Sequence, residues 1–421
     1  MDMDRRSAIR TDGGPSCGQF KMPDVSDERV ISFADGGLDI PERLLLAHAR
    51  GEVLFITGAG TSRPAGLPDF SGLVLAVYAR LDAATHEALI TARETANDNG
   101  WISPRGLTEQ QLAEVNRFRK GDYDVVLGML ERRMDGPAAT KSSVRNTVVE
   151  VLRARSTGPA SIHRALIRLA DRGAAVTIVT TNFDLLLEMA AKKLRKNLQS
   201  YALGGIPRPS KRSEFSGVLH IHGALSVNLN RASDLILTDQ DFGEFYLRRR
   251  TIPDFIYDAA RLFHLVLVGY SANDAPMRYL LNAVAADVSR FDDLKERFAF
   301  VGMHVPFDRV DIEDWKQRGI TPIAYSAATE HSALAEGLEW WAEFSAINGK
   351  RARVEVELKR ITRCSRANAT EGDRDWFDHL IRRSATNERI RMSALISRNG
   401  ADIDWLDAIL SIGRDPIGQL A

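Results

Sequence analysis

Short runs of apolar, mostly β-branched residues alternate with helical patterns from about Glu42 to Phe344. This alternation is typical of a parallel sheet whose strands are joined by helices. Each run is apolar along its whole length, which is expected when helices cover both faces of a sheet. We predict strands at Val53–Thr57, Val176–Thr181, Val218–Ile221, Leu265–Gly269, Phe298–Val301 and Pro322–Tyr325. The fold class is therefore α/β, with a doubly wound, mostly parallel sheet.

Helical patterns fill the intervals between these strands. We predict helices at Thr108–Lys120, Ala160–Arg172, Asp184–Arg195, Asp274–Ala286 and Ser332–Phe344. The first opens with Thr-Glu-Gln-Gln, a capping box in which Thr108 is the N-cap and Gln111 lies three residues on. Residues 71–155 contain no convincing strand, so we expect a helical layer inserted after the first strand.

The two ends of the chain differ from its centre. Residues 1–30 are charged and contain Gly, Pro and Ser, which predicts a flexible arm. Residues 350–400 hold 13 Lys and Arg against 7 Asp and Glu in a helical pattern. We therefore expect a main domain over 31–347 and a small helical appendage over 348–421.

The composition excludes several classes of protein. Lys and Arg number 56, as do Asp and Glu, so overall charge gives no reason to expect direct nucleic-acid binding. The two cysteines, Cys17 and Cys364, are too few for a disulfide scaffold or a four-cysteine zinc site. No stretch approaches the roughly 18 apolar residues of a membrane span. With no secretory signal in the sequence, we expect a cytoplasmic protein without a metal site.

Glycines follow the first predicted strand in the segment 51–72, which reads GEVLFITGAGTSRPAGLPDFSG. Glycines at this point let the backbone approach a pyrophosphate, and a following helix would add N–H donors. The usual dinucleotide fingerprint fails, because Arg63 stands where its third glycine would fall. An ordinary NAD-dependent dehydrogenase is therefore disfavoured.

Three later strands also end in polar residues. TTNFD brings Asn182 and Asp184 to the crevice side of the sheet, although both could simply cap the next helix. HIHGA places His220 and His222 on one face of a strand, where they could bind a metal ion. A histidine in a strand is more often an ordinary core or surface residue. GYS, which ends at Ser271, could bind a phosphate or a ribose as the first glycine loop could. The alternative is that it only precedes a capped helix.

Together, GAGxSxxxGLPDF, TTNFD, HG and GYS resemble the motifs of the sirtuin family over about residues 42–346. Protein-deacylating sirtuins carry a four-cysteine zinc module, whereas residues 224–263 contain no cysteine here. That interval instead holds LILTDQDFGEFYL, which resembles the sirtuin-like enzymes of bacterial antiphage systems. Ser71 and Thr181 also stand where an arginine and a glutamine are usual in the family.

The resemblance implies a Rossmann-like sheet and cleavage of the nicotinamide–ribose bond of NAD, which is then the substrate, with no zinc. It implies that Asn182 holds the ribose hydroxyls and a water, and that His222 is the general base. The expected NAD-binding residues are Gly58, Ala59, Gly60, Ser62, Pro68, Asp69, Phe70, Thr181, Asp184, Gly269 and Ser271.

Two other functions remain open at this stage, an NAD-dependent protein deacylase and a non-catalytic NAD- or ADP-ribose-sensing assembly subunit. The antiphage resemblance also implies an effector that is held inactive until it is triggered. We therefore expect a homo-oligomer and a separately encoded partner such as a HerA-type ATPase, with no membrane association.

Overall fold

The computed structural model describes residues 28–33, 38–95, 104–136, 141–155, 157–173, 175–209, 215–225, 235–270, 281 and 294–413. The expected N-terminal arm up to residue 27 lies outside these residues. So does the expected helix Asp274–Ala286, apart from residue 281.

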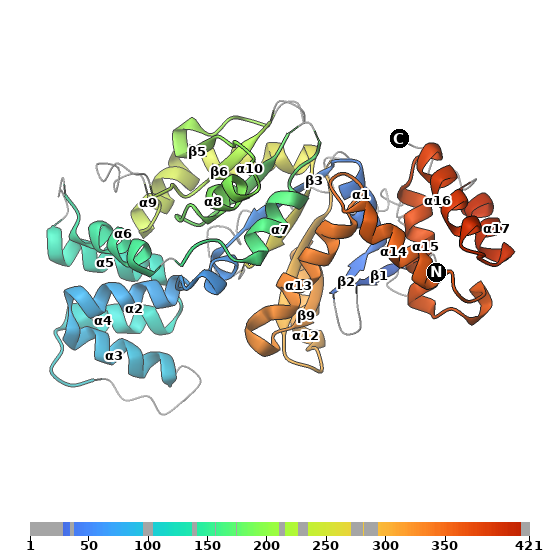
Figure 1. Ribbon diagram of the computed structural model, residues 1–421. Coiled ribbons are helices and arrows are strands. Elements are labelled where there is room, and N and C mark those ends of the chain that lie inside the picture. Colours follow the sequence, from blue (N-terminus) through green and yellow to red (C-terminus); the bar gives the residue numbers. More distant parts are fainter. Residues whose placement is uncertain are drawn as a thin grey trace, which may run out of the picture.

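A seven-stranded, fully parallel sheet forms the centre of the molecule (Figure 1). Its strands lie in the spatial order β5-β6-β4-β3-β7-β8-β9. The strands are β3 (Val53–Thr57), β4 (Thr177–Thr180), β5 (Ser200–Ala202), β6 (Gly217–His220), β7 (His264–Val268), β8 (Arg297–Met303) and β9 (Thr321–Ser326). The chain leaves β3 towards β4 on one side and later returns to β7 on the other. Open α/β sheets bind ligands at such a switch point.

Helices cover both faces of the sheet. Successive residues of a strand point to opposite faces, so each strand contributes side chains to two cores. Val53 and Phe55 of β3 belong to the core shared with one set of helices, α1 (Glu42–Ala49), α7 (Ser161–Leu169), α8 (Leu186–Lys193) and α13 (Ala328–Phe344). Leu54 and Ile56 belong to the opposite core, shared with α10 (Thr251–Leu262) and α12 (Arg309–Gln317). The predicted doubly wound α/β class is therefore confirmed.

The six predicted strands are confirmed, with ends that shift by one or two residues. Three short strands were not predicted. Strand β5 has three residues at the edge of the sheet, too few for a periodic signal. Strands β1 (Val30–Phe33) and β2 (Leu38–Pro41) form a separate antiparallel hairpin.

Within the described parts of residues 70–155, five α-helices form the predicted layer between β3 and β4. They are α2 (Phe70–Leu81), α3 (Ala83–Glu94), α4 (Glu109–Arg119), α5 (Tyr123–Asp135) and α6 (Ser143–Arg155). The predicted capping box is present, with Thr108 and Gln111 bonding reciprocally at the start of α4. Inside the layer, Arg133 binds both Glu114 and Asp82, at 2.8 and 2.7 Å, and Tyr78 donates to Glu114 at 2.9 Å. The layer therefore has an internal polar network as well as an apolar core.

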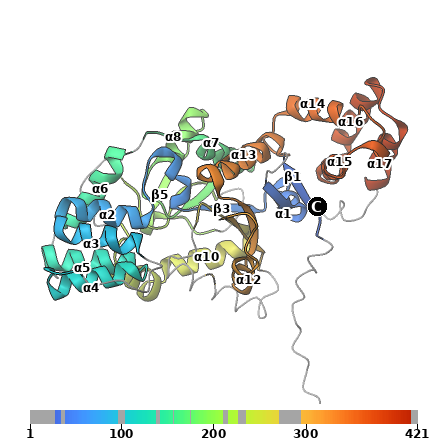
Figure 2. The ribbon, with the colours of Figure 1, turned by 90° about the horizontal axis from the view of Figure 1, so that it is seen from below.

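In the C-terminal segment as far as residue 413, the structure describes four α-helices, α14 (Arg351–Ile361), α15 (Glu371–Arg383), α16 (Thr386–Arg398) and α17 (Ile403–Ile412). Their buried apolar residues belong to the same continuous core as the hairpin and α13. Glu42 of α1 is 4% exposed and contacts both His379 and Arg382 of α15. Figure 2 shows these helices and the helical layer at opposite ends of the molecule, as does Figure 1.

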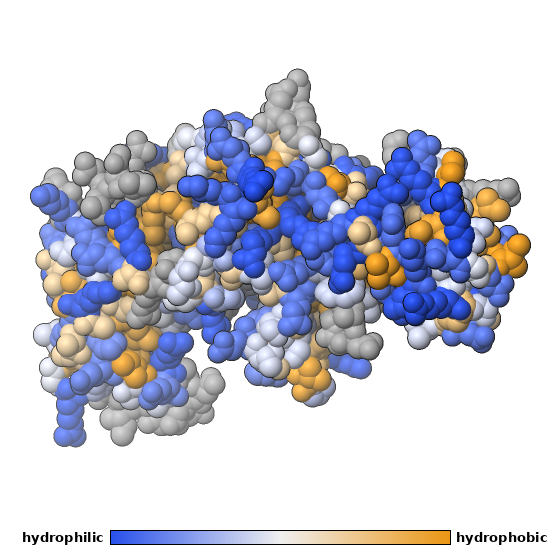
Figure 3. Space-filling view, in the orientation of Figure 1, coloured by the Kyte–Doolittle hydropathy of each residue, from blue (hydrophilic) through white to orange (hydrophobic). Residues whose placement is uncertain are grey.

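Polar side chains cover most of the face seen in Figure 3, with apolar residues on the C-terminal helices among the exceptions. Ile390, Ile403 and Leu410 on these helices are all at least 60% exposed. Within the described ranges, no helix has the length and apolar composition needed to cross a bilayer.

The packing of Trp405 yields a test of the C-terminal helices. Trp405 is fully buried, lies 4.6 Å from the ring of Phe377 and donates to the Cys364 carbonyl at 2.8 Å. We expect Trp405→Ala to lower the free energy of unfolding by about 3–5 kcal/mol, because it leaves a cavity and an unpaired carbonyl. Chemical denaturation followed by circular dichroism measures this change. The control Ile403→Ala, at a position 77% exposed, should change it by less than about 0.5 kcal/mol.

Candidate functional site

The parallel register brings the four sequence motifs to one edge of the sheet. Thr57 pairs with Thr180 on one side and with Val268 on the other, and Thr180 pairs with His220. The strands β3, β4, β6 and β7 therefore end at one level, and the loops after them carry the predicted site residues. Thr181 extends this register, because its N–H donates to the Thr57 carbonyl at 3.0 Å. Ser271 lies outside the described residues.

The loops after β3 and β7 are in direct backbone contact. The N–H of Gly58 donates to the Val268 carbonyl at 3.0 Å, and that of Gly60 to the Gly269 carbonyl at 2.8 Å. A Cβ on either Gly58 or Gly60 would lie 2.8 Å from the Gly269 oxygen. Gly269 itself has φ +60°, and a Cβ there would meet the Thr61 nitrogen at 2.4 Å. These glycines are needed for loop-to-loop packing, a role that the sequence interpretation did not assign to them.

Asn182 lies between these loops and is held through its amide nitrogen. Nδ2 donates to the Gly58 carbonyl at 3.0 Å and to Ser62 Oγ at 2.9 Å. A carbonyl oxygen can only accept, so this contact fixes which end of the amide faces Gly58. In the part of the chain that the structure describes, the amide bonds through Nδ2, which leaves Oδ1 to accept from a ligand hydroxyl.

Asp184 is linked to Asn182 through one hydroxyl. Ser62 Oγ accepts from Asn182 and donates to Asp184 Oδ2 at 2.8 Å, and Ser62 is 3% exposed. Burial raises the pKa of the Asp184 carboxyl, although hydrogen bonds from Ser62 and the Leu186 N–H lower it. Asp184 Oδ1 accepts from the N–H of Leu186, the first residue of α8, at 3.1 Å, although the N-cap position itself is Leu185. Among the described residues, the Asn182 side chain bonds to the neighbouring loop instead.

The predicted residues 68–70 lie at the start of α2. Asp69 is the N-cap of this helix and accepts from the Gly72 N–H at 2.7 Å. The Phe70 ring contacts Tyr123 edge-on, with centroids 6.0 Å apart. Both side chains thus join the loop after β3 to the helical layer.

His222 lies in an apolar enclosure beside this polar network. It is 4% exposed, its Nε2 is 2.7 Å from the Tyr246 hydroxyl, and the Phe242 ring meets it edge-on at 5.4 Å. Burial lowers the pKa of His222 to about 3, so the imidazole is neutral at neutral pH. Tyr246 belongs to a π-helical segment, Gly243–Arg248. Its role was not predicted, although it stands in the LILTDQDFGEFYL stretch that the sequence singled out.

Among the described residues, the two strand histidines have different hydrogen-bond partners. His220 bonds to the Asn182 carbonyl and to Glu188, whereas His222 bonds to Tyr246. Among the described residues there is no group of three or more His, Cys, Asp or Glu side chains that could hold a metal ion.

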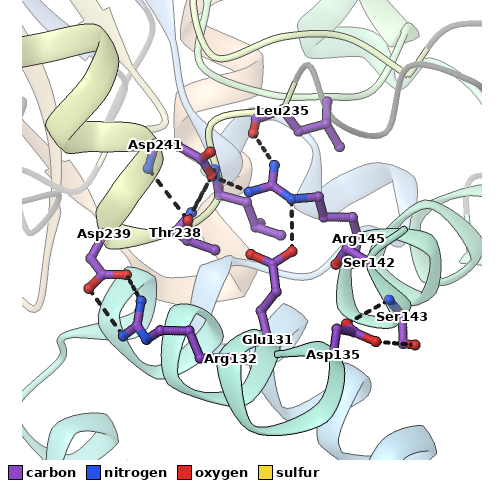
Figure 4. Close-up of polar contacts among 11 residues, drawn as sticks. Glu131, Arg132, Asp135, Ser142, Ser143, Arg145, Leu235, Thr238, Asp239 and Asp241 are labelled. Atoms are coloured by element: carbon purple, nitrogen blue, oxygen red, sulfur yellow. Dashed lines mark hydrogen bonds and ion pairs between the residues drawn. The ribbon is translucent and has the colours of Figure 1, made fainter. Parts of the chain in front are cut away.

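An arginine from the helical layer fixes the segment in front of the π-helix (Figure 4). Arg145 of α6 donates to Asp241 at 2.7 Å and to the Leu235 carbonyl at 2.7 Å, and it also binds Glu131 at 2.9 Å. Arg132 makes a second pair across the same boundary with Asp239 of α9 (Asp239–Phe242). The Ile236 N–H then donates to the His222 carbonyl at 2.9 Å. The helical layer thus takes part in building the enclosure around His222.

Comparison with known proteins supports part of the sequence interpretation. Residues 176–323 match the family model of the SIR2-like domain, which confirms the sirtuin-like resemblance for that region. The chain is 36% identical over 422 residues to the uncharacterized protein y4cA of Sinorhizobium fredii (strain NBRC 101917 / NGR234), covering 90% of this chain. It spans 32% of that relative's length. A solved complex of a Sir2 homolog with NAD aligns with 73% of this chain and 95% of its own, at 15% identity and a TM-score of 0.35.

The contact between the two glycine loops predicts an asymmetry between glycines. We expect Gly60→Ala to destabilise the protein and to disturb the Asn182 loop, because the new methyl group would meet backbone atoms of Gly269. Gly205→Ala is the matched control, since a Cβ at Gly205 meets no atom within 4 Å. Thermal unfolding compares the two. Equal midpoints for both variants would contradict the proposed crowding.

The buried histidines predict sensitivity to acid. Burial lowers the pKa of His48 and His163 to about 4 and that of His222 to about 3, against about 6.5 when unfolded. At these three positions the unfolded chain therefore binds more protons than the folded chain below pH 6.5, so their contribution to stability falls as pH falls from 6.5 towards 4. Each such histidine multiplies the unfolding constant about tenfold per pH unit. Urea titrations between pH 7 and 5 measure how the free energy of unfolding depends on pH. His222→Gln should reduce this dependence by the equivalent of about one proton. An unchanged pH dependence would contradict the lowered pKa of His222.

Proposed function

We propose that this protein binds NAD at the carboxyl edge of its sheet and hydrolyses the nicotinamide–ribose bond to nicotinamide and ADP-ribose. The observation that carries the proposal is the placement of Asn182 and His222 after two neighbouring strands, β4 and β6. Among the described residues the Asn182 amide bonds through Nδ2 only, and His222 is buried and neutral. The SIR2-like match over residues 176–323 includes both residues.

The described residues fit this substrate. Asn182 Oδ1 is available to accept from a ribose hydroxyl or from a water, and Ser62 beside it is nearly buried. Asp184 lies one hydroxyl away and can oppose positive charge when it is ionised. Cleavage of a cationic nicotinamide leaves a neutral molecule and an oxocarbenium-like ribosyl group, so the site needs an acceptor and a carboxylate more than it needs an acid.

In the proposal, His222 acts as the base. A neutral imidazole can accept a proton, and its Nε2 is within hydrogen-bond distance of the Tyr246 hydroxyl. Its low pKa reflects the apolar enclosure, and substrate oxygen atoms near the ring would raise its basicity. Gly58, Ala59, Gly60, Gly269 and Ser271 remain proposed contacts of the pyrophosphate and adjacent ribose, and Pro68, Asp69 and Phe70 of the nicotinamide.

The cellular setting is part of the same proposal. The resemblance to antiphage sirtuin-like enzymes supports a gated NAD-depleting effector in the cytoplasm, assembled as a homo-oligomer. A HerA-type ATPase is the proposed partner, and residues 348–421 are the proposed appendage for contact with it. The basis for this setting is analogy.

The test is NAD turnover by the purified protein, alone and with the product of the adjacent gene, with nicotinamide and ADP-ribose measured by chromatography. We expect Asn182→Ala and His222→Ala each to reduce turnover at least about a hundredfold, because each removes a group that acts on the reacting atoms. Glu87→Gln on α3, at an exposed position outside the proposed site and the proposed appendage, is the control and should retain activity. Intact NAD in every wild-type sample would refute the proposal, as would full activity in both variants.

A further inference from the structure

A pair formed by Glu188 of α8 and His220 of β6 contacts the backbone of Asn182. His220 is fully buried, and its Nδ1 lies 2.9 Å from the Asn182 carbonyl oxygen. Its Nε2 lies 2.8 Å from Glu188 Oε1, which also accepts from Ser200 Oγ at 2.6 Å. The chain of contacts therefore runs from the edge strand β5, through Glu188 and His220, to the backbone of Asn182.

We propose that partly buried Glu188 and buried His220 form a carboxylate–imidazolium pair that positions Asn182 for the reaction. This inference rests on the proposed function for its catalytic consequence, although the ion pair can be tested without it. Neither residue was assigned this role from the sequence, where His220 was considered as a metal ligand or a core histidine.

The two partners of His220 define its protonation state. A backbone carbonyl can only accept, so Nδ1 must carry a hydrogen. An ionised Glu188 also only accepts, so Nε2 must carry one too, and the ring is then cationic. Burial opposes this charge, yet the hydrogen bond and charge of Glu188 raise the pKa of His220 above its usual value. Burial likewise opposes ionisation of Glu188, and its bond to His220 lowers the pKa of that carboxyl.

The backbone of Asn182 explains why such a support is needed. The strand ladder ends at Thr181, so the polar groups of Asn182 require partners other than neighbouring strands. Its N–H donates to Thr180 Oγ1 at 3.0 Å, and its carbonyl accepts from His220. Both ends of the residue are thus held by side chains, which fixes the direction in which the amide projects towards Gly58 and Ser62.

The charged form of His220 makes this support depend on pH. The groups that act electrostatically on the ring are Glu188 from α8 and Asp184 from the loop before it, and both favour the cation. When the ring loses its proton at alkaline pH, only one nitrogen can donate, so either the Asn182 or the Glu188 contact is lost. Loss of the Asn182 contact releases the carbonyl and with it the catalytic amide.

The ion pair is tested first by nuclear magnetic resonance on the full chain. The ring protons of His220, assigned by comparison with His220→Asn, should titrate above pH 6.5 in the wild type. Glu188→Gln should shift that titration to lower pH, because it removes the partner charge. Titration at or below pH 6.5 in the wild type, or no shift in Glu188→Gln, would overturn the pair.

The positioning role is tested by the pH profile of NAD turnover. Glu188→Gln should lower kcat about tenfold to a hundredfold and move the alkaline decline to lower pH. His220→Asn keeps a donor near the Nδ1 position, so it should retain more kcat than His220→Leu while losing the alkaline decline. Thermal unfolding confirms that each variant is folded, and Glu87→Gln is again the carboxylate control.

The outcomes separate the two proposals. If the wild type cleaves no NAD, the proposed function fails, while the resonance titration still decides whether the pair exists. If the wild type is active and folded Glu188→Gln keeps its kcat and pH profile, the positioning role is refuted and the proposed function stands.

Discussion

The organisation of this protein depends on the common register of four parallel strands. Because β3, β4, β6 and β7 end at one level, segments up to about 200 residues apart in sequence meet at one edge. The glycine loops after β3 and β7 then contact each other through backbone atoms, with no space for a side chain between them. This contact fixes the Gly58 carbonyl, which in turn holds the amide of Asn182. The candidate site is thus a consequence of strand pairing before it is a consequence of side-chain chemistry.

The site has two parts with different electrostatic character. On one side, Asn182, Ser62 and Asp184 form a connected polar network. On the other, His222 lies among aromatic rings and remains uncharged at neutral pH. The first part offers hydrogen-bonding groups and a carboxylate, and the second shields an imidazole from water. The two parts lie at the ends of neighbouring strands.

Much of this arrangement could be predicted from the sequence. The strands β3, β4 and β7 are continuous apolar runs followed by polar residues, and such runs have few alternatives in an α/β protein. The edge strand β5 and the β1–β2 hairpin are too short to produce a periodic pattern. The contacts of His220 with Glu188 and of His222 with Tyr246 join different elements. The local sequence around these residues therefore does not predict them. The glycines were found, but their crowding against Gly269 depends on a loop more than 200 residues away.

The contact made by Arg145 has a consequence for how the enclosure around His222 can change. One guanidinium satisfies Glu131, Asp241 and the Leu235 carbonyl at once, and its side chain is only 11% exposed. Moving α6 away from this segment would take the Arg145 donor from the Leu235 carbonyl and break its ion pair with Asp241. The position of α6 and the position of the segment that leads to the aromatic rings around His222 are therefore coupled through one side chain.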